Sequence, residues 1–411
     1  MTEFFNVITS DQFADLLDRF PRISAETVSL DASLARYLSA DVIASENLPE
    51  QARSTVDGFA VRAEDTFGAT DAIPSLLEVI EPVGMGTIPK FTLSSGQAAP
   101  IPTGGFLPTG ADAVVMVEYT NRAGEDSVEI TRPVTLQTNV LGKGEDCESG
   151  VPLLVKGTRL RFQDIGYLAA AGFADLPVYR KPRVAILSSG DEIVPVETKP
   201  LPGQIRDANG HALAALVREA GAEPVLFDII PDSAEKLKKA LESALSHCDV
   251  LAISGGSSVG TRDLMKDAVS SLDGSEILAH GISVRPGKPT LLAQREEKAI
   301  FGLPGHPVSA LIVAQIFLFP FLRYLQGDRM RKGPLGYRTD ATLSSAIHST
   351  IGLEEFIRIR IEEKPDGNFE AHPVYGKSGM LSTMVKADGI LVIPLSVEGF
   401  SKGETVRVVW L

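Results

Sequence analysis

The chain has 411 residues, and 39 Lys and Arg against 53 Asp and Glu give a formal net charge of −14. Roughly 150 residues per domain predicts two to four domains for this length. Apolar residues make up 44 % and charged residues 22 %, close to soluble globular proteins, which excludes a disordered chain. The acidic balance argues against a general nucleic-acid binder, because phosphate contacts require clustered Lys and Arg.

Cysteine content and apolar runs indicate the cellular compartment in which the protein is expected. Cys147 and Cys248 are the only cysteines, too few and too far apart for a disulfide framework or a cysteine zinc site. The N-terminus has no basic segment followed by a long apolar one, so no targeting segment is expected. The most apolar stretch, 310–325, is interrupted by polar residues and a proline and falls short of the roughly 20 apolar residues of a membrane span. We expect a buried helix there, and a cytoplasmic protein without membrane contact.

The sequence pattern changes along the chain and predicts four units. Residues 1–50, helical from residue 11 on, together with 144–178 are expected to form a helical and linking scaffold. Short apolar runs between Gly, Pro and Thr predict a β-rich lid domain over 51–143. Strands that alternate with helices predict a central open, mostly parallel α/β sheet over 179–327. Residues 328–411 return to strand patterns and predict a small C-terminal β domain, so the fold class is multidomain α/β plus β.

Periodicity sets the expected elements of the α/β region. Asn209 is the expected cap of its first helix, and Asp232 with Glu235 fits a capping box for the second. The expected order is strand 184–187, helix 208–220, strand 225–230, helix 232–247, strand 250–253 and strand 299–302, followed by a long helix.

Chemistry is expected where these strands end, because ligands of open parallel sheets bind outside the carboxyl ends of the strands. Glycines there let the backbone approach a ligand, and consecutive N–H groups can hold an anion. The P-loop, the dinucleotide fingerprint, G-x-S-x-G and H-E-x-x-H are absent, which weakens ATPase, dehydrogenase, hydrolase and zinc-enzyme interpretations. The informative segments are Gly203-Gln-Ile-Arg-Asp-Ala-Asn209, Ser254-Gly-Gly-Ser-Ser-Val-Gly-Thr-Arg-Asp263, Arg285-Pro-Gly-Lys-Pro289 and Leu303-Pro-Gly-His-Pro-Val-Ser309.

Each motif taken alone has a purely structural alternative. The Gly-Gly pair could be an ordinary turn, and Asp207 a carboxylate favoured by the dipole of the helix that it precedes. The basic turn with Arg285 and Lys288 could be solvated surface. His306 could merely hydrogen-bond at a helix start, and Asp57 with the next glycine could form an ordinary hairpin turn.

Taken together, the ordered segments resemble the molybdopterin molybdenumtransferase family, bacterial enzymes related to the C-terminal domain of gephyrin. The similarity extends from about residue 10 to 411, and the ordered set is far more specific than any single block. The matching blocks are Val56-Asp-Gly-Phe-Ala-Val-Arg62, Pro102-Thr-Gly104, Gly110-Ala-Asp-Ala-Val-Val-Met-Val-Glu118, Gly144-Glu-Asp146, Ser188-Ser-Gly-Asp-Glu192, Gly203-Gln-Ile-Arg-Asp207, Ser254-Gly-Gly256, Ser258-Val-Gly260, Pro286-Gly-Lys-Pro289 and Gly302-Leu-Pro-Gly305.

The chain departs from the usual family pattern at several positions. Val56, Phe59, Ser257, Arg285 and His306 stand where the family usually has Met, Tyr, Val, Lys and Asn. The exchange of Lys for Arg keeps the charge but changes the donor geometry.

The resemblance implies a transferase that inserts molybdenum from molybdate into adenylylated molybdopterin and releases AMP, with Mg²⁺ as cofactor. It implies a homodimer with shared active sites and transient contact with other molybdenum-cofactor biosynthesis proteins. The implied catalytic residues are Asp57, Asp146, Glu192, Asp207 and Asp263, of which Asp207 and Asp263 are also the expected metal ligands. The implied substrate-binding residues are Thr103, Ser254, Gly255, Gly256, Ser258, Arg285, Lys288, Pro304, Gly305 and Ser309.

The residue types suit that chemistry. Molybdate and pyrophosphate are anions and need cations and N–H groups, and Mg²⁺ prefers carboxylate oxygens. Two alternatives remain: a non-catalytic molybdopterin-binding or scaffold protein of the same fold, and a nucleotide-sugar or NAD enzyme, which lacks its fingerprint. Metal-dependent AMP release on addition of molybdate separates the first interpretation from the others.

Overall fold

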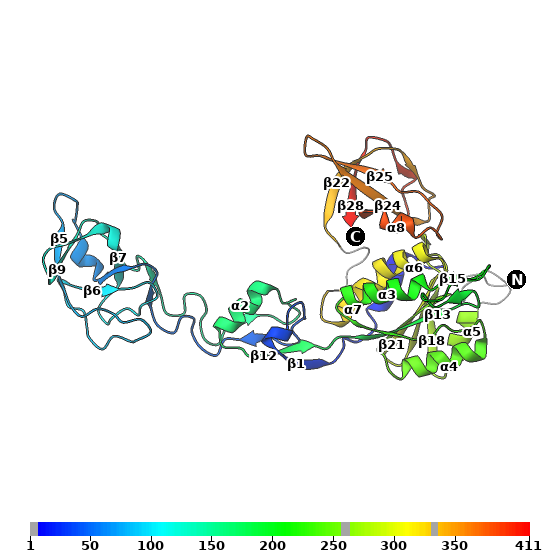
Figure 1. The fold of residues 1–411 in the computed structure, drawn as a ribbon, viewed down its shortest axis with the longest axis horizontal. Helices are drawn as coiled ribbons and strands as arrows, with labels where there is room; N and C mark the ends of the chain where they lie inside the picture. The colour runs from blue at the N-terminus through cyan, green and yellow to red at the C-terminus, as the bar shows by residue number, and fades with distance from the viewer. Residues whose placement is uncertain (1–6, 256–263, 330–335) are drawn as a thin grey trace.

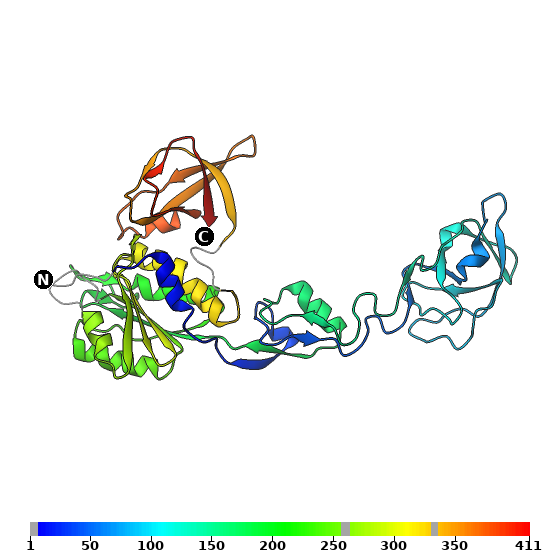
Figure 2. The ribbon, with the colours of Figure 1, turned by 180° about the vertical axis from the view of Figure 1, so that it is seen from behind.

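The computed structural model describes residues 7–255, 264–329 and 336–411. The molecule is elongated (Figures 1 and 2), with a small β-rich lid at one end and a larger α/β body at the other. A slender arm joins the two, and a C-terminal barrel lies beside the α/β body. This agrees with the predicted fold class in its coarse form, a multidomain chain that mixes α/β and sheet-rich parts.

The lid is one six-stranded sheet in the order β7-β4-β6-β5-β9-β8. Side chains of successive strand residues point to opposite faces. Val61 and Val115 accordingly lie in one apolar cluster, and Ala60 and Val114 in another. Its elements are β4 (Gly58–Val61), η2 (Ala63–Thr66), β5 (Ser75–Val79), β6 (Gln97–Ile101), β7 (Ala113–Met116), η3 (Val117–Tyr119), β8 (Thr120–Arg122) and β9 (Ser127–Ile130).

The arm consists of paired short strands and one helix, drawn between lid and body in Figure 1. The expectation that residues 11–50 are helical is wrong beyond the first helix. Short strands in this stretch pair instead with strands that lie far away in the sequence. Its antiparallel pairs are β1 (Ala25–Ser29) with β12 (Asp175–Tyr179), β2 (Val42–Ile43) with β11 (Pro152–Leu154), and β3 (Arg53–Ser54) with β10 (Val140–Leu141). The arm also holds η1 (Leu30–Ala32) and α2 (Phe162–Ala170).

The α/β body is built on a six-stranded sheet in the order β16-β13-β17-β21-β20-β18. The first four strands are parallel, and β20 runs antiparallel to them. The edge strand β18 is antiparallel to β20 and so has the direction of the first four. The strands are β13 (Arg183–Ser189), β16 (Glu223–Leu226), β17 (Val250–Gly255), β18 (Ser275–His280), β20 (Leu291–Arg295) and β21 (Lys298–Leu303), and the short parallel pair β14 (Ile193–Val194) and β15 (Ile205–Arg206) lies outside the sheet.

Helices cover both faces of this sheet. Val184 and Ile186 of β13 pack with α1, α3, α6 and α7 in one core, whereas Ala185 and Leu187 pack with α4 and α5 in another. Successive side chains of β13 point to opposite faces of the sheet, and this divides the apolar side chains between the two layers. The helices are α1 (Ser10–Leu17), α3 (Ala208–Glu219), α4 (Ala234–Leu245), α5 (Leu264–Ser270), α6 (Pro307–Val313) and α7 (Phe319–Leu325).

Three local expectations in this body are corrected. The second strand is Glu223–Leu226 rather than 225–230. The cap of α3 is Asp207, not Asn209, and its Oδ1 accepts the backbone N–H of Gly210 at 2.9 Å. The expected capping box of α4 does not form, since Ser233 is its N-cap and Asp232 accepts a hydrogen bond from Ser189 instead.

The apolar stretch near residue 310 is a core helix. α6 and α7 are joined by a single π-helical turn, η4 (Ala314–Leu318), just before Pro320, which cannot donate a backbone hydrogen bond. Pro307–Leu325 has the length and composition to cross a membrane, but 78 % of its most apolar window is buried inside the structure. The expected buried helix is thus observed.

The C-terminal barrel comprises residues 336–411. Its main sheet runs β24-β25-β22-β28-β26, and a further pairing of β26 with β24 closes it. β19 (Val284–Arg285), a strand from the α/β body, pairs in parallel with β24 and joins the two units. The remaining elements are β22 (Arg338–Leu343), β23 (Ile347–His348), β24 (Glu354–Glu363), β25 (Phe369–Pro373), α8 (Ser382–Val385), β26 (Gly389–Ile393), β27 (Gly399–Phe400) and β28 (Thr405–Trp410).

Candidate functional site

The carboxyl ends of β13, β17 and β21 form one edge, called here the sheet edge. In the parallel register Ser188 pairs with Ser254, and Ser254 pairs with Leu303. The segments that follow these strands therefore start side by side, as expected for a ligand site of this class of sheet. Predicted binding residues Pro304 and Gly305 follow β21 directly, and α6 begins just beyond them.

Glycine is required where these segments meet. Gly255 has φ +106°, and a Cβ there would lie 2.0 Å from the carbonyl oxygen of Ser189. A Cβ on Gly305 would lie 3.6 Å from the Cα of Gly255. The end of β17 and the segment after β21 thus approach through bare backbone. Gly256, Ser258 and Asp263 lie outside the described residues, so their predicted roles stay predictions.

Three buried polar atoms at this edge have no hydrogen-bond partner among the residues that the structure describes. They are the hydroxyls of Ser188 and Ser254 and the Oδ1 of Asn209. The Nδ2 of Asn209 donates to the carbonyl of Gly305 at 2.9 Å and ties α3 to the segment after β21. Since buried polar atoms are normally paired, this edge is suited to contact with a polar molecule.

Asn209 is a residue that sequence reasoning misread. Its position inside a capping motif suggested a local role, whereas the true cap is Asp207. The motif itself could have revealed the position of Asn209. Once Asp207 is taken as the cap, Asn209 falls in the first helical turn and faces the sheet.

An acidic cleft of about 480 Å³ lies beside the sheet edge. Asp191, Asp207 and Asp228 line it, together with His211 and Glu197. Glu192 is absent from its lining, but its carboxylate folds over Gly190, where a Cβ would come within 2.7 Å of Oε2.

The donor set of this cleft fits Mg²⁺, which takes hard oxygen ligands. Capping of α3 uses only one oxygen of Asp207. Among residues 7–255, 264–329 and 336–411, no ready-made group of three metal-ligating side chains occurs. The second expected ligand, Asp263, lies outside these ranges, so the Asp207–Asp263 pair stays a prediction.

The basic turn is not free surface. Arg285 donates to Glu355 of the C-terminal barrel at 2.9 Å, and the Glu355 side chain is only 5 % exposed whereas that of Arg285 is 55 % exposed. Gly287, at φ +120°, packs against α6, since a Cβ there would lie 2.4 Å from Val313. The turn therefore holds Arg285 and Lys288 beside α6, which also carries the buried Ser309.

The C-terminal barrel adds groups that sequence reasoning missed. The backbone N–H of Val308 donates to the carbonyl of Ser378 at 3.0 Å. A Cβ on Gly379 would lie 3.8 Å from the His306 ring. Arg358 is 9 % exposed and donates to Gly376 at 3.3 Å, and burial lowers the pKa of its guanidinium. Nothing local marks these residues, because they belong to a separate unit that β19 and β24 join to the α/β body.

Asp57 and Thr103 form a pair in the lid. Oδ1 of Asp57 accepts the backbone N–H of Thr103 at 2.7 Å and its hydroxyl at 3.0 Å. These hydrogen bonds, the backbone one foremost, lower the pKa of the exposed Asp57 carboxyl. Asp57, which directly precedes β4, thus contacts the segment after β6, a longer-range contact than the ordinary hairpin turn that was its structural alternative.

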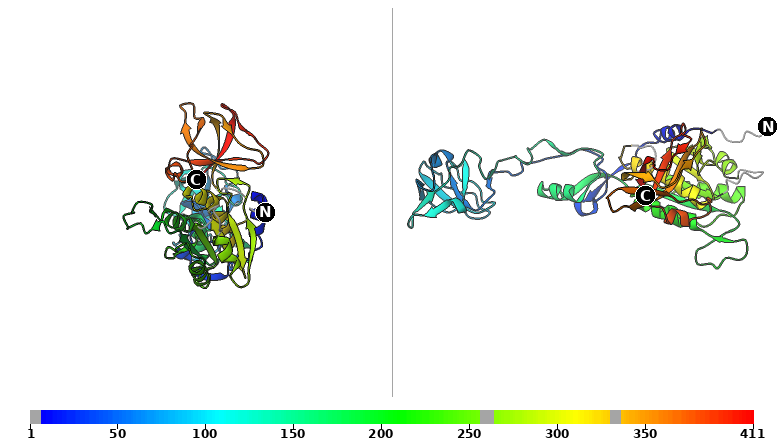
Figure 3. Two further views of the ribbon diagram at one scale, coloured as in Figure 1. Left: turned by 90° about the vertical axis from the view of Figure 1, so that its right-hand side faces the viewer. Right: turned by 90° about the horizontal axis from the view of Figure 1, so that it is seen from above.

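The lid pair and the sheet edge are not brought together within one chain. Figure 3 shows the lid and the α/β body at opposite ends of the molecule. Asp146 lies in the arm, where its backbone N–H donates to Leu48 and its carbonyl accepts from Tyr167. One chain thus distributes the predicted catalytic carboxylates over the lid, the arm and the body.

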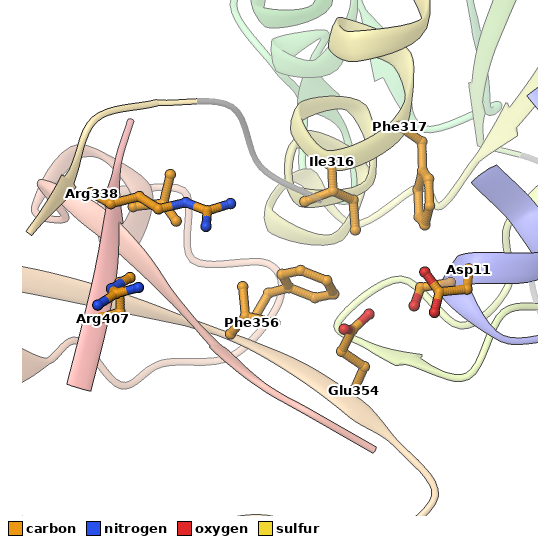
Figure 4. A pocket seen from close by; sticks show the side chains of 10 residues that line it. Asp11, Ile316, Phe317, Arg338, Glu354, Phe356 and Arg407 are labelled. Atoms are coloured by element: carbon orange, nitrogen blue, oxygen red, sulfur yellow. The ribbon is translucent and has the colours of Figure 1, made fainter. Parts of the chain in front are cut away.

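A second cavity of about 310 Å³ lies between α1, η4 and the C-terminal barrel. In Figure 4 Asp11 and Glu354 point toward one another at one end, and Arg338 and Arg407 lie at the other. Burial, and secondarily the charge of Asp11, raise the pKa of Glu354. None of the predicted site residues lines this cavity.

Family models match nearly the whole chain. They are described as "MoeA N-terminal region (domain I and II)" over residues 8–172, "Probable molybdopterin binding domain" over 185–324, and "MoeA C-terminal region (domain IV)" over 340–411. The boundaries between them fall near the start of the α/β body and the start of the C-terminal barrel.

Curated relatives match over most of their own length. A molybdopterin molybdenumtransferase from Nostoc sp. is 36 % identical over 391 residues, which cover 94 % of this chain and 88 % of the relative. A protein of the same name from Bacillus subtilis is 33 % identical and covers 93 % of this chain and 89 % of its own.

Solved structures agree with the fold. A molybdopterin biosynthesis protein from Pyrococcus horikoshii OT3 superposes with a TM-score of 0.85 at 32 % identity, covering 99 % of this chain and 100 % of its own. A second molybdopterin biosynthesis protein structure, from Pyrococcus horikosii, has a TM-score of 0.83 at 36 % identity, covering 98 % of this chain and 99 % of its own.

Proposed function

The chain belongs to the molybdopterin molybdenumtransferase family, and from that premise we propose that it is the enzyme that inserts molybdenum from molybdate into adenylylated molybdopterin, with release of AMP. Molybdopterin is the substrate named by the family model that covers the α/β body and by the curated relatives. A non-catalytic scaffold of the same fold is not favoured, because the relatives are named as transferases.

The sheet edge is the observation that carries this proposal. Bare backbone at Gly255 and Gly305, the unpartnered buried atoms of Ser188, Ser254 and Asn209, and the starts of α3 and α6 all meet there. Backbone N–H groups at helix starts favour anions, and the buried polar atoms suit a heterocycle rich in donors and acceptors. A pterin that carries a phosphate has both features.

The residues around this edge suit the reaction. Cleavage of a pyrophosphate linkage needs its negative charge balanced, and Arg285 and Lys288 are held beside α6 to do so. Mg²⁺, when bound, would supply further positive charge through Asp207 and, by the family resemblance, Asp263. Asp207 is orientated by its cap contact with Gly210. Water or molybdate supplies the oxygen that AMP gains when the bond between the two phosphates breaks.

The homodimer and its shared site are part of the proposal. Asp57 and Thr103 are exposed at the far end of the molecule and make no contact with the sheet edge of their own chain. A two-fold dimer would place the lid of one chain over the α/β body of its partner and complete two sites. Asp146 and Glu192 are assigned to the same completed site by family resemblance.

The finer domain roles follow from this arrangement. Residues 51–143 act as the lid, 179–327 as the molybdopterin-binding domain and 328–411 as the C-terminal β domain, with 1–50 and 144–178 as the linking scaffold. A cytoplasmic location and transient contacts with other proteins of molybdenum-cofactor biosynthesis complete the proposal.

The test is an AMP-release assay with purified protein, adenylylated molybdopterin and Mg²⁺. Release should depend on molybdate and should be lost in Asp207→Ala, while Lys236→Ala on the exposed face of α4 keeps wild-type activity. Binding of molybdopterin without AMP release under any metal condition would favour the scaffold alternative.

A further inference from the structure

A second charged hollow lies where the arm meets the α/β body, at the opposite edge of the sheet from the candidate site. Its volume is about 500 Å³. Tyr179, which precedes β13, and the residues that follow α7 line it and define its position. The lining residues are Arg22, Val155, Lys156, Gly157, Thr158, Tyr179, Gly327, Asp328 and Arg329. This feature is called the hinge hollow.

Among the described residues, the wall of the hinge hollow carries Arg22, Lys156 and Arg329, three cations from three separate segments. Lys156 Nζ lies 5.9 Å from the centre of the Tyr179 ring. Arg22 lies 4.7 Å above the Tyr324 ring and donates to the Tyr324 carbonyl at 2.7 Å. In a chain with a net charge of −14, such a gathering needs a specific explanation.

The acidic groups nearby are largely occupied. Asp328 forms an ion pair with Arg323 at 2.8 Å and accepts the hydroxyl of Tyr37 at 3.1 Å. Its side chain is 11 % exposed. Asp41 accepts the backbone N–H of Lys156 at 2.7 Å. Because Asp328 already has its counter-charge, the hollow keeps an excess of positive charge, which a cleft wall concentrates.

The hollow is held by tightly packed backbone. Gly327 has φ +113°, and a Cβ there would lie 2.7 Å from the Tyr179 ring. A Cβ on Gly157 would lie 3.1 Å from the carbonyl of Gly327. The N–H of Ile23 donates to Leu325 at 3.0 Å. These contacts fix the backbone next to residues that line the hollow.

We propose that the hinge hollow is a binding site for a diphosphate group, distinct from the sheet edge. Arg and Lys are the residues that hold phosphate oxygens, and the Thr158 hydroxyl can donate to one. A diphosphate is preferred to a single phosphate because it offers more charged oxygens to cations that come from both the arm and the body. The group can come from inorganic pyrophosphate or from a nucleoside diphosphate.

Isothermal titration of the full chain with sodium pyrophosphate tests the proposal. The protein used for the titration carries Lys288→Ala, which removes one cation at the sheet edge and leaves the Arg285–Glu355 ion pair intact. One diphosphate per chain should bind, more weakly as salt is raised. Adding Lys156→Ala and Arg329→Ala should weaken binding at least tenfold. Arg22 is left intact because it also bonds to Tyr324.

The matched control adds Arg218→Ala and Lys236→Ala, two exposed cations of α3 and α4, and should leave affinity within twofold. A parallel titration with ADP identifies the source, since ADP binding more tightly than pyrophosphate indicates a nucleotide. No binding, equal loss in the control, or equal affinity for inorganic phosphate or molybdate would overturn the proposal. Glutamine variants at the two positions replace the alanines if circular dichroism shows misfolding.

Discussion

Replacing Arg285 with Ala should destabilise the junction between the α/β body and the C-terminal barrel by about 2 kcal/mol. Its partner Glu355 is 5 % exposed, so the variant leaves a nearly buried carboxylate without its counter-charge, and leaving a buried polar group unpaired costs about 1–3 kcal/mol. At about 2–4 °C per kcal/mol, the melting transition of this part should fall by about 4–8 °C.

The reverse change should matter less. In Glu355→Gln the amide oxygen can still accept from Arg285, whose side chain is 55 % exposed and can be solvated. The expected loss is about 1 kcal/mol or less.

Differential scanning calorimetry of wild type, Arg285→Ala and Glu355→Gln from pH 5 to 8 measures these differences. Lys288→Ala, in the same turn but without a role in this ion pair, is the control. Equal losses for Arg285→Ala and Glu355→Gln would refute the reasoning.

Three further predictions address other groups. Burial and the charge of Asp11 raise the pKa of Glu354 above 4.5, so its contribution to stability is present below the unfolded pKa and is lost as pH rises through the folded pKa. Glu354→Gln should therefore have a higher melting temperature than wild type at pH 7 but not at pH 4. An equal difference at both pH values would contradict this. His306→Asn should keep most activity in the AMP-release assay, since the ring makes no hydrogen bond among those found in the described residues; a hundredfold loss would show a catalytic role. Asp57→Ala and Asp263→Ala should each be inactive, and random mixing should restore about a quarter of wild-type activity, because half of the dimers are hybrids with one intact site of two; no recovery after verified exchange refutes a shared site.

Local sequence patterns predicted much of the α/β body. Leu237, Leu241 and Leu245 repeat at helical spacing, and all three are buried in α4. Short apolar runs likewise located β13, β17 and β21. In the stretch from residue 11 to 50 the same reasoning failed, since strands as short as Val42–Ile43 have no periodicity and form only through partners more than a hundred residues away.

The site residues show the same difference between local patterns, which could be predicted, and long-range contacts, which could not. Asp207, Ser254 and Gly305 were predicted from loops that follow strands, and they lie at or beside one edge. Glu355 and Ser378 were missed because their contacts with Arg285 and Val308 come from a distant barrel joined by a two-residue strand. A sequence pattern does not encode such a long-range contact.

The central claim is that molybdenum insertion and AMP release are one reaction of this chain. Purified protein, adenylylated molybdopterin, Mg²⁺ and molybdate should yield AMP, quantified by chromatography, and pterin-bound molybdenum, quantified by mass spectrometry, in a one-to-one ratio. Neither product should form when molybdate is omitted or in Asp207→Ala. AMP release that proceeds equally without molybdate, or that leaves no molybdenum on the pterin, would contradict the account.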